Sequence, residues 1–216
     1  MVRRTVWSSR VIFVQPQPEP ADFDCKVRQP GLKYLQKNPG GKLPRLWGKV
    51  ISDLWTAYDG ICAYSCHWFP LLGGESVDHF VPQTINSQLA YEWSNYRLAL
   101  QKMNSRKGAD TNIVDPFTIT GNWFVLVFPA LLVKANSQLS DTLKSKVQHT
   151  IEALKLNEEA LVNIRLGYVL EYCDGDITLR GLYKRAPFVT YELERQKLTE
   201  TIKVMMKRRR ISSSVP

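Results

Sequence analysis

The stretch that decides the fold runs from Gly60 to Asp110 and is GICAYSCHWFPLLGGESVDHFVPQTINSQLAYEWSNYRLALQKMNSRKGAD. Residues 75–80 and 96–100 predict two short β-strands. Residues 102–108 end on a glycine and predict a short helix. The sequence therefore predicts two short strands followed directly by a helix.

An amphipathic helix is predicted before this stretch. Apolar residues recur there at helical spacing, and Gly60 ends the pattern. Further upstream, the proline-rich residues 15–20 predict an extended linker. The apolar positions of the helix are Leu43, Leu46, Trp47, Val50, Ile51, Leu54, Trp55 and Tyr58.

The part of the chain after Pro116 is predicted to be mostly helical. It contains an apolar segment at 123–133, then two helices, a strand and a final helix, predicted at 140–154, 157–172, 177–182 and 191–210. We divide the chain into an N-terminal extension with the amphipathic helix (1–59), a core (60–115), and a helical and strand region with a basic tail (116–216). The expected fold class is α+β, a mostly helical chain around a small ββα core.

Composition and charge limit the class of protein. The 216 residues include 29 Lys and Arg against 20 Asp and Glu, which gives a formal net charge of +9. The longest apolar run, residues 123–133, is too short to cross a bilayer, so no membrane association is expected. The four cysteines lack the spacing of small secreted proteins, which predicts a reducing, cytoplasmic location.

The excess positive charge favours a polyanion as partner, because Lys and Arg that neutralise phosphates release condensed counterions. In the core, Arg97, Arg106 and Lys107 are candidates to bind nucleic acid. The tail residues Lys207, Arg208, Arg209 and Arg210 are further candidates, although a terminal basic run is often only a solvated end.

Three short motifs in the core resemble those of a known enzyme family. They are SVDHFVP at 76–82, SNYRLA at 94–99 and NSRKG at 104–108, with Asn95 sixteen residues after His79 and Asn104 nine further on. Their order and spacing are similar to the three-part motif of HNH endonucleases. Residues 58–64, 89–95, 114–117 and 150–157 also resemble the HNH proteins found with retrons and Septu-type anti-phage systems. The similarity covers about residues 43–165.

This resemblance implies a ββα-metal nuclease core that hydrolyses nucleic-acid phosphodiester bonds. Asp78 and Asn104 would hold Mg²⁺ or Mn²⁺, since oxygen ligands suit these cations. His79 would be the general base, because an imidazole titrates near neutral pH. Asn95 would tie the two strands together and orient His79, and Lys107, on the same helix face as Asn104, would lie near the phosphate.

The resemblance also implies a biological setting. We expect a role in bacterial anti-phage defence, with DNA rather than RNA as the substrate. An ATPase of the ABC or SMC type is the expected partner protein.

The sequence departs from the family at the structural zinc site, which in relatives uses two C-x-x-C pairs. Here the first pair is stretched to Cys62-Ala-Tyr-Ser-Cys66, and Leu100 and Met103 stand in place of the second. Tetrahedral zinc needs four nitrogen or sulfur ligands. His67 with Cys25 or Cys173 could supply the missing ligands in principle, but we expect an apolar knuckle and no structural zinc.

Two other functions remain open. The changed zinc knuckle favours a catalytically decayed nucleic-acid-binding or scaffold subunit, whereas the intact Asp78, His79 and Asn104 oppose it. An RNA-directed nuclease, acting for example on tRNA, is also compatible with the core. None of the core motifs distinguishes the ribose of RNA from the deoxyribose of DNA.

Overall fold

The computed structural model describes residues 14–213, with side chains to residue 207. At the N-terminal end, η1 (Asp24–Arg28) continues into α1 (Gln29–Lys37), a helix that the sequence analysis did not predict. The 3-10 turn η2 (Leu46–Val50) then leads into α2 (Ile51–Ala57). The predicted amphipathic helix is thus confirmed from Leu46 onward, with a 3-10 first half.

The centre of the chain forms the predicted strand, strand and helix. Strand β1 (Glu75–His79) pairs antiparallel with β2 (Tyr96–Leu100), and β2 passes directly into α3 (Gln101–Lys107). The connection between the strands contains η3 (Gln88–Tyr91) and η4 (Trp93–Asn95). Gly108 ends α3 with a φ of 50°, a left-handed conformation that glycine adopts without steric cost.

A second small sheet follows the turn η5 (Pro116–Thr118). The apolar segment predicted at 123–133 forms a hairpin of β3 (Phe124–Val127) and β4 (Leu132–Ala135). The two predicted helices are confirmed as α4 (Asp141–Ala153) and α5 (Glu159–Asp174). Asn157 does not cap α5, because its side chain instead bonds both backbone groups of Val133.

The C-terminal prediction is partly wrong. Residues 177–182 do not form a strand but lead into α6 (Leu179–Arg185), where the Thr178 hydroxyl accepts a hydrogen bond from the Gly181 amide and caps the helix. The helix predicted at 191–210 is two helices, α7 (Pro187–Arg195) and α8 (Thr201–Ser213). Lys197, with a φ of 57°, lies in the turn between them.

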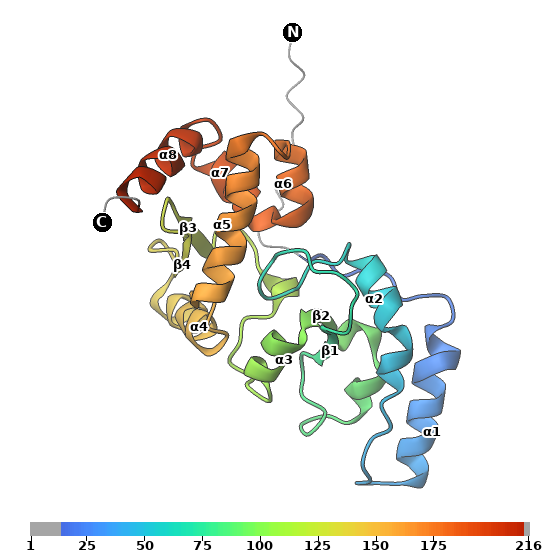
Figure 1. Ribbon diagram of the computed structural model, residues 1–216. Coiled ribbons are helices and arrows are strands. Elements are labelled where there is room, and N and C mark those ends of the chain that lie inside the picture. Colours follow the sequence, from blue (N-terminus) through green and yellow to red (C-terminus); the bar gives the residue numbers. More distant parts are fainter. Residues whose placement is uncertain (1–13, 214–216) are drawn as a thin grey trace.

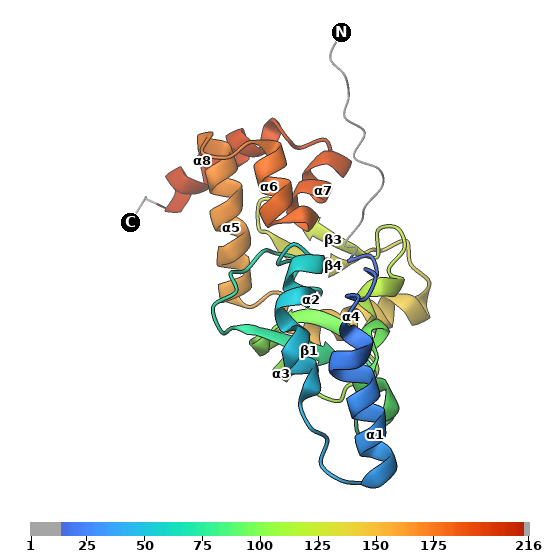
Figure 2. The same ribbon diagram turned by 90° about the vertical axis from the view of Figure 1, so that its right-hand side faces the viewer.

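The elements are arranged in two regions with a shared core. Figures 1 and 2 show α1, α2, the β1–β2 sheet and α3 at one end of the molecule, and α5 to α8 at the other. Buried apolar residues from all three predicted segments belong to one hydrophobic core. The mixture of helices with two small antiparallel sheets is an α+β architecture. Within residues 14–213, no helix has the length and apolarity needed to cross a membrane.

Candidate active site

A cleft of about 650 Å³ opens between η2 and the β1–α3 unit. Asp78 and His79 reach it from the end of β1, and Asn104 reaches it from α3. Arg45 and Trp47 line it on the side of η2. The structure therefore brings the predicted base and both predicted metal ligands to one cavity.

The His79 imidazole is held by a backbone carbonyl and two aromatic rings. Its Nε2 lies 3.1 Å from the Ala90 carbonyl oxygen, and the Tyr96 hydroxyl donates to the same oxygen at 2.8 Å. The rings of Trp47 and Tyr96 meet the imidazole edge to face, with centroids 4.6 and 5.3 Å away. A carbonyl oxygen only accepts hydrogen bonds, so Nε2 carries the proton and Nδ1 keeps its lone pair. Burial lowers the pKa of His79 to about 4, which makes the ring neutral at neutral pH.

Asn95 connects the segment after β1 to the segment before β2. Its Oδ1 accepts from the Val81 amide at 2.8 Å, and its Nδ2 donates to the carbonyls of Val81 and Leu89, both at 3.0 Å. The side chain is buried, so these bonds are shielded from water. This is the predicted tie between the strands, and it fixes the backbone that follows His79.

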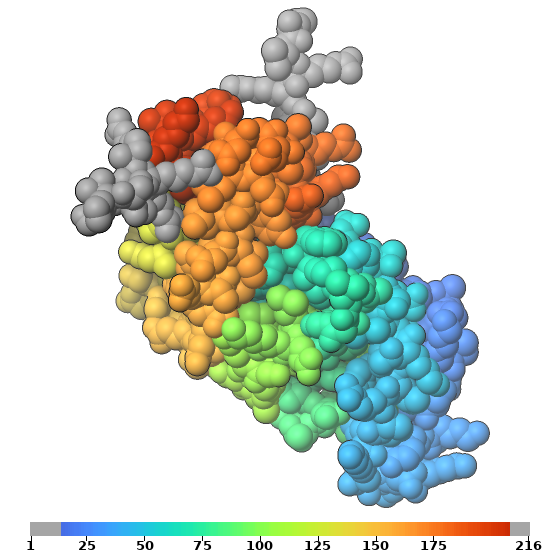
Figure 3. Space-filling view, in the orientation of Figure 1, coloured from blue at the N-terminus to red at the C-terminus, as the bar shows by residue number. Residues whose placement is uncertain are grey.

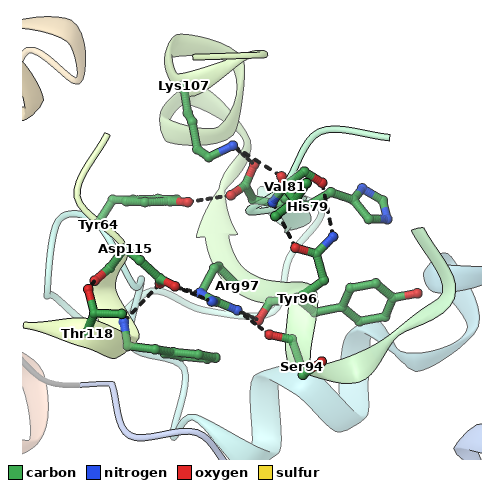
Figure 4. A network of polar contacts seen from close by, with 12 residues as sticks. Tyr64, His79, Val81, Ser94, Tyr96, Arg97, Lys107, Asp115 and Thr118 are labelled. Carbon is green, nitrogen blue, oxygen red and sulfur yellow. Dashed lines mark hydrogen bonds and ion pairs between the residues drawn. The ribbon is translucent and has the colours of Figure 1, made fainter. Parts of the chain in front are cut away.

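Asp78 lies beneath the cleft, with both carboxylate oxygens engaged. The buried Tyr64 hydroxyl donates to its Oδ2, and Lys107 Nζ lies 3.3 Å from its Oδ1 (Figure 4). Asp78 is only 2% exposed, and burial raises the pKa of its carboxyl, an effect that Lys107 opposes. Tyr64 belongs to none of the three motifs, and its position between Cys62 and Cys66 was the available signal in the sequence.

Asn104 supplies an amide oxygen at the same cleft. Its Nδ2 donates to the Ser76 hydroxyl and to the Val77 carbonyl, each at 3.2 Å. Its Oδ1 accepts no hydrogen bond from any described residue. Each Asp78 oxygen has a further lone pair beyond its bonds to Tyr64 and Lys107. One carboxylate and one unpaired amide oxygen at a single cleft fit a hard cation such as Mg²⁺ or Mn²⁺.

The structure corrects the assignment of Arg97 to nucleic-acid binding. Arg97 is 4% exposed and forms a two-bond ion pair with Asp115, at 2.8 and 2.7 Å. Its guanidinium also stacks on the Phe117 ring at 3.5 Å, and Figure 4 shows it pointing to Asp115. A side chain buried by these contacts cannot reach a phosphate from solvent.

Lys107 also requires a correction, because it is buried and its amine faces the protein. Besides Asp78, the amine bonds the His79 carbonyl oxygen at 3.1 Å. Lys107 therefore links β1 to α3 below the cleft. The predicted contact of this amine with a phosphate does not fit its position.

The remaining basic candidates lie outside the cleft. Arg106 donates to the Leu154 carbonyl and pairs with Glu158, which Lys102 also contacts at 2.8 Å. These hydrogen bonds lower the pKa of Glu158 to about 2. Lys207 is exposed on α8, at the opposite end of the molecule from α3 (Figure 1). The side chains of Arg208, Arg209 and Arg210 lie outside the described residues.

The Cys62–Cys66 knuckle packs against the end of β2. Cys62 Sγ accepts from the Leu100 amide at 3.5 Å, and Met103 is buried in the same hydrophobic core as Cys62 and Cys66. Burial raises the pKa of the Cys66 thiol to about 12, which disfavours the thiolate that zinc binds. Among residues 14–207, no group of three or more His, Cys, Asp or Glu side chains could hold a metal.

Comparisons of the chain with protein-family models and with curated proteins found no relative. No protein-family model matches the chain, and no curated protein matches it.

Proposed function

We propose that this protein is a metal-dependent HNH-type endonuclease that hydrolyses nucleic-acid phosphodiester bonds. The observation that carries the proposal is the cleft shared by Asp78, Asn104 and His79, whose Nε2 contact with the Ala90 carbonyl leaves Nδ1 unprotonated. The ββα order of β1, β2 and α3 and the motif spacing support it. The net charge of +9 suits a polyanionic substrate.

In this proposal each residue has a distinct task. His79 accepts a proton from the attacking water at Nδ1, while the Ala90 carbonyl fixes the ring through Nε2. Asn95 holds the backbone around His79. Asp78 and Asn104 hold a Mg²⁺ or Mn²⁺ ion, which when bound stabilises negative charge on the phosphate and the leaving oxygen.

The biological setting is proposed from the motif resemblance alone. The resemblance favours a role for this protein as an effector of bacterial anti-phage defence. In that role it would act on DNA together with an ATPase partner of the ABC or SMC type. Co-purification with such a partner would support this setting, whereas cleavage of tRNA in preference to plasmid would favour the RNA-directed alternative.

One observation favours a second candidate function, a nucleic-acid-binding or scaffold subunit without catalysis. Asp78 is 2% exposed and already satisfied by Tyr64 and Lys107. A metal ligand needs lone pairs that are accessible from the cleft, and a fully enclosed carboxylate would lack them. Metal binding therefore separates the two candidates.

The experiment combines cleavage and metal binding. The purified protein is incubated with plasmid, single-stranded DNA or tRNA, together with Mg²⁺, Mn²⁺ or a chelator. We expect cleavage only with metal. Asp78→Ala and Asn104→Ala should raise the Mn²⁺ concentration needed for half-maximal cleavage and weaken Mn²⁺ binding measured by electron paramagnetic resonance.

Matched controls are available in exposed residues outside the cleft, Asp176→Ala for the carboxylate and Asn112→Ala for the amide. Both should behave as the wild type. A wild-type protein that binds nucleic acid but neither binds Mn²⁺ nor cleaves any substrate would establish the second candidate instead.

A further inference from the structure

We propose that residues 29–52 form the surface that binds the phosphate backbone of the nucleic acid and guides it into the cleft. We call its five cationic residues the basic strip: Lys33, Lys37, Lys42, Arg45 and Lys49. The role of the cleft as the cleavage site rests on the proposed function. Binding by the basic strip can be measured without any cleavage.

The charge of this segment is one-sided. Residues 29–52 contain the five cations of the basic strip and no Asp or Glu. All five side chains are exposed, and none of them forms an ion pair with a described residue. Exposed, uncompensated Lys and Arg are the groups that release counterions when they neutralise phosphates.

Other cations near the site are compensated by carboxylates. Arg28 pairs with Glu19, Asp24 and Glu92. Arg97 and Lys107 are buried with Asp115 and Asp78, and Lys102 and Arg106 share Glu158. The uncompensated positive charge beside the cleft is therefore concentrated on the basic strip.

The basic strip is continuous with the cleft. Arg45, Trp47 and Ile51 line the same cavity as His79, and the Trp47 ring packs against the imidazole. Figure 3 shows this segment, coloured blue to cyan, as the lower right end of the molecule. A phosphate bound at Arg45 would thus lie at the entrance to the cavity that contains the proposed base.

The segment is anchored firmly to the rest of the site. Gly31 packs so closely on Tyr91 that an added Cβ would lie 2.2 Å from its ring, and the Tyr91 hydroxyl donates to the Pro44 carbonyl at 3.2 Å. The Tyr34 hydroxyl donates to the Lys42 carbonyl at 2.9 Å and closes the turn after α1. These contacts hold α1 and the following loop beside η3, so the cations keep a fixed relation to the cleft.

Carboxylates do not cancel this charge at the cleft. Of the acidic residues, Glu75 and Asp78 line the cavity, both on β1. Asp78 is paired with Lys107, and the Glu75 carboxylate accepts a hydrogen bond from the Gly73 amide at 2.8 Å. Repulsion of a phosphate is therefore confined to the β1 lining of the cavity, whereas Arg45 of the basic strip contributes a positive charge to the same cavity.

The test is a binding measurement in a chelator, where a metal-dependent nuclease cannot cut. Fluorescence anisotropy with a labelled duplex DNA and with tRNA compares the wild type with Lys37→Gln/Lys42→Gln/Lys49→Gln between about 50 and 200 mM salt. We expect about tenfold weaker binding at the lowest salt. The slope of log affinity against log salt should fall by about one unit for each lysine that contacts a phosphate.

The control removes three exposed lysines elsewhere: Lys134→Gln/Lys144→Gln/Lys184→Gln. It matches the change in net charge, so long-range electrostatics alone would lower the affinity of both triple variants equally. A thermal melt of each variant shows that folding is preserved. The proposal is supported if only the strip variant loses affinity and salt dependence, with either probe.

The proposal is overturned if the two triple variants bind alike, or if the wild type binds neither probe. It is also overturned if removal of residues 207–216, but not the strip variant, reduces the salt slope, because the basic tail is then the binding surface. Strip-dependent binding by a protein that never cleaves would contradict the proposed function and leave this inference intact.

Discussion

The amine of Lys107 lies 3.3 Å from Oδ1 of Asp78, and both side chains are almost completely buried. The ion pair joins α3 to β1 directly beneath the cleft, and Tyr64 completes it from the Cys62–Cys66 knuckle. The motif resemblance gives Asp78 the role of a metal ligand and places Lys107 near the phosphate. In the structure the two side chains instead form one buried ion pair.

The first prediction concerns the stability of this pair. Lys107→Met should destabilise the fold by about 3–5 kcal/mol, because it leaves the Asp78 carboxylate buried without a counter-charge. The double variant Asp78→Asn/Lys107→Met should recover part of that loss, since both charges are then absent. Urea unfolding measures both changes. A Lys107→Met variant as stable as the wild type would contradict the buried ion pair.

The second prediction separates catalysis from binding. His79→Ala should abolish cleavage and leave nucleic-acid affinity nearly unchanged, because a general base acts on the water and contributes little to ground-state contacts. His149→Ala is the matched control, since that imidazole is half-exposed, pairs with Asp110 and does not line the cleft. Wild-type cleavage rates in His79→Ala would remove this residue from the mechanism.

A third prediction tests the corrected role of Arg97. Asp115→Ala should cost about 3–5 kcal/mol of stability, because it leaves the buried guanidinium without its carboxylate. Glu171→Ala, which breaks the exposed pair with Arg185, should cost no more than about 1 kcal/mol. Urea unfolding of the two variants provides the comparison, and equal losses would argue against a buried Arg97.

The fourth prediction is a pH dependence of stability from His67. Burial lowers the pKa of this imidazole from an ordinary value of 6.5 to about 4 in the folded protein. Between these values the unfolded chain binds a proton that the folded chain does not, so stability falls as the pH falls. By pH 4, this effect of His67 should lower the free energy of unfolding by on the order of 3 kcal/mol.

The measurement is the free energy of unfolding at several pH values from neutral down to about 4. His67→Asn should show a shallower decline than the wild type. The remaining decline of His67→Asn includes the contribution of His79, whose pKa is lowered in the same direction. Parallel curves for the wild type and His67→Asn would refute this account.

The fifth prediction is that the purified protein folds without stoichiometric zinc. A structural zinc site contributes on the order of 10 kcal/mol or more to folding, so chelation would lower the melting temperature sharply if one were present. We expect no such shift, because Leu100 and Met103 cannot coordinate zinc and Cys62 and Cys66 are packed in the core. One zinc per chain by elemental analysis, with a chelator-sensitive melt, would show that other ligands complete the site.

The sequence by itself determined the local order of the central unit. Local sequence signals placed β1, β2 and α3 within a residue or two, and the glycine after α3 marked its end. The same local signals located α4 and α5. Spacing along the chain placed His79 at the end of β1 and Asn104 within α3, because β1 and β2 are neighbouring strands of one hairpin-like pair and α3 follows β2 directly.

Local patterns were insufficient where packing overrode them. The β-branched and apolar residues 177–182 favoured a strand, yet no strand within residues 14–213 pairs with them, and the Thr178 cap starts α6 instead. Helix α1 was missed because its apolar face depends on contact with the distant η3, including the close fit of Gly31 on Tyr91.

Only the tertiary structure decided which charges are available to a substrate. Arg97 and Lys107 resemble phosphate ligands in sequence, but Asp115 and Asp78 neutralise them in the interior. The basic strip, which has no motif of its own, comes to lie beside the cleft because α1 and η2 pack against the loop between β1 and β2. Whether a cation is buried with a carboxylate or exposed to a polyanion depends on residues far away in the chain, and this is information that spacing along the sequence does not contain.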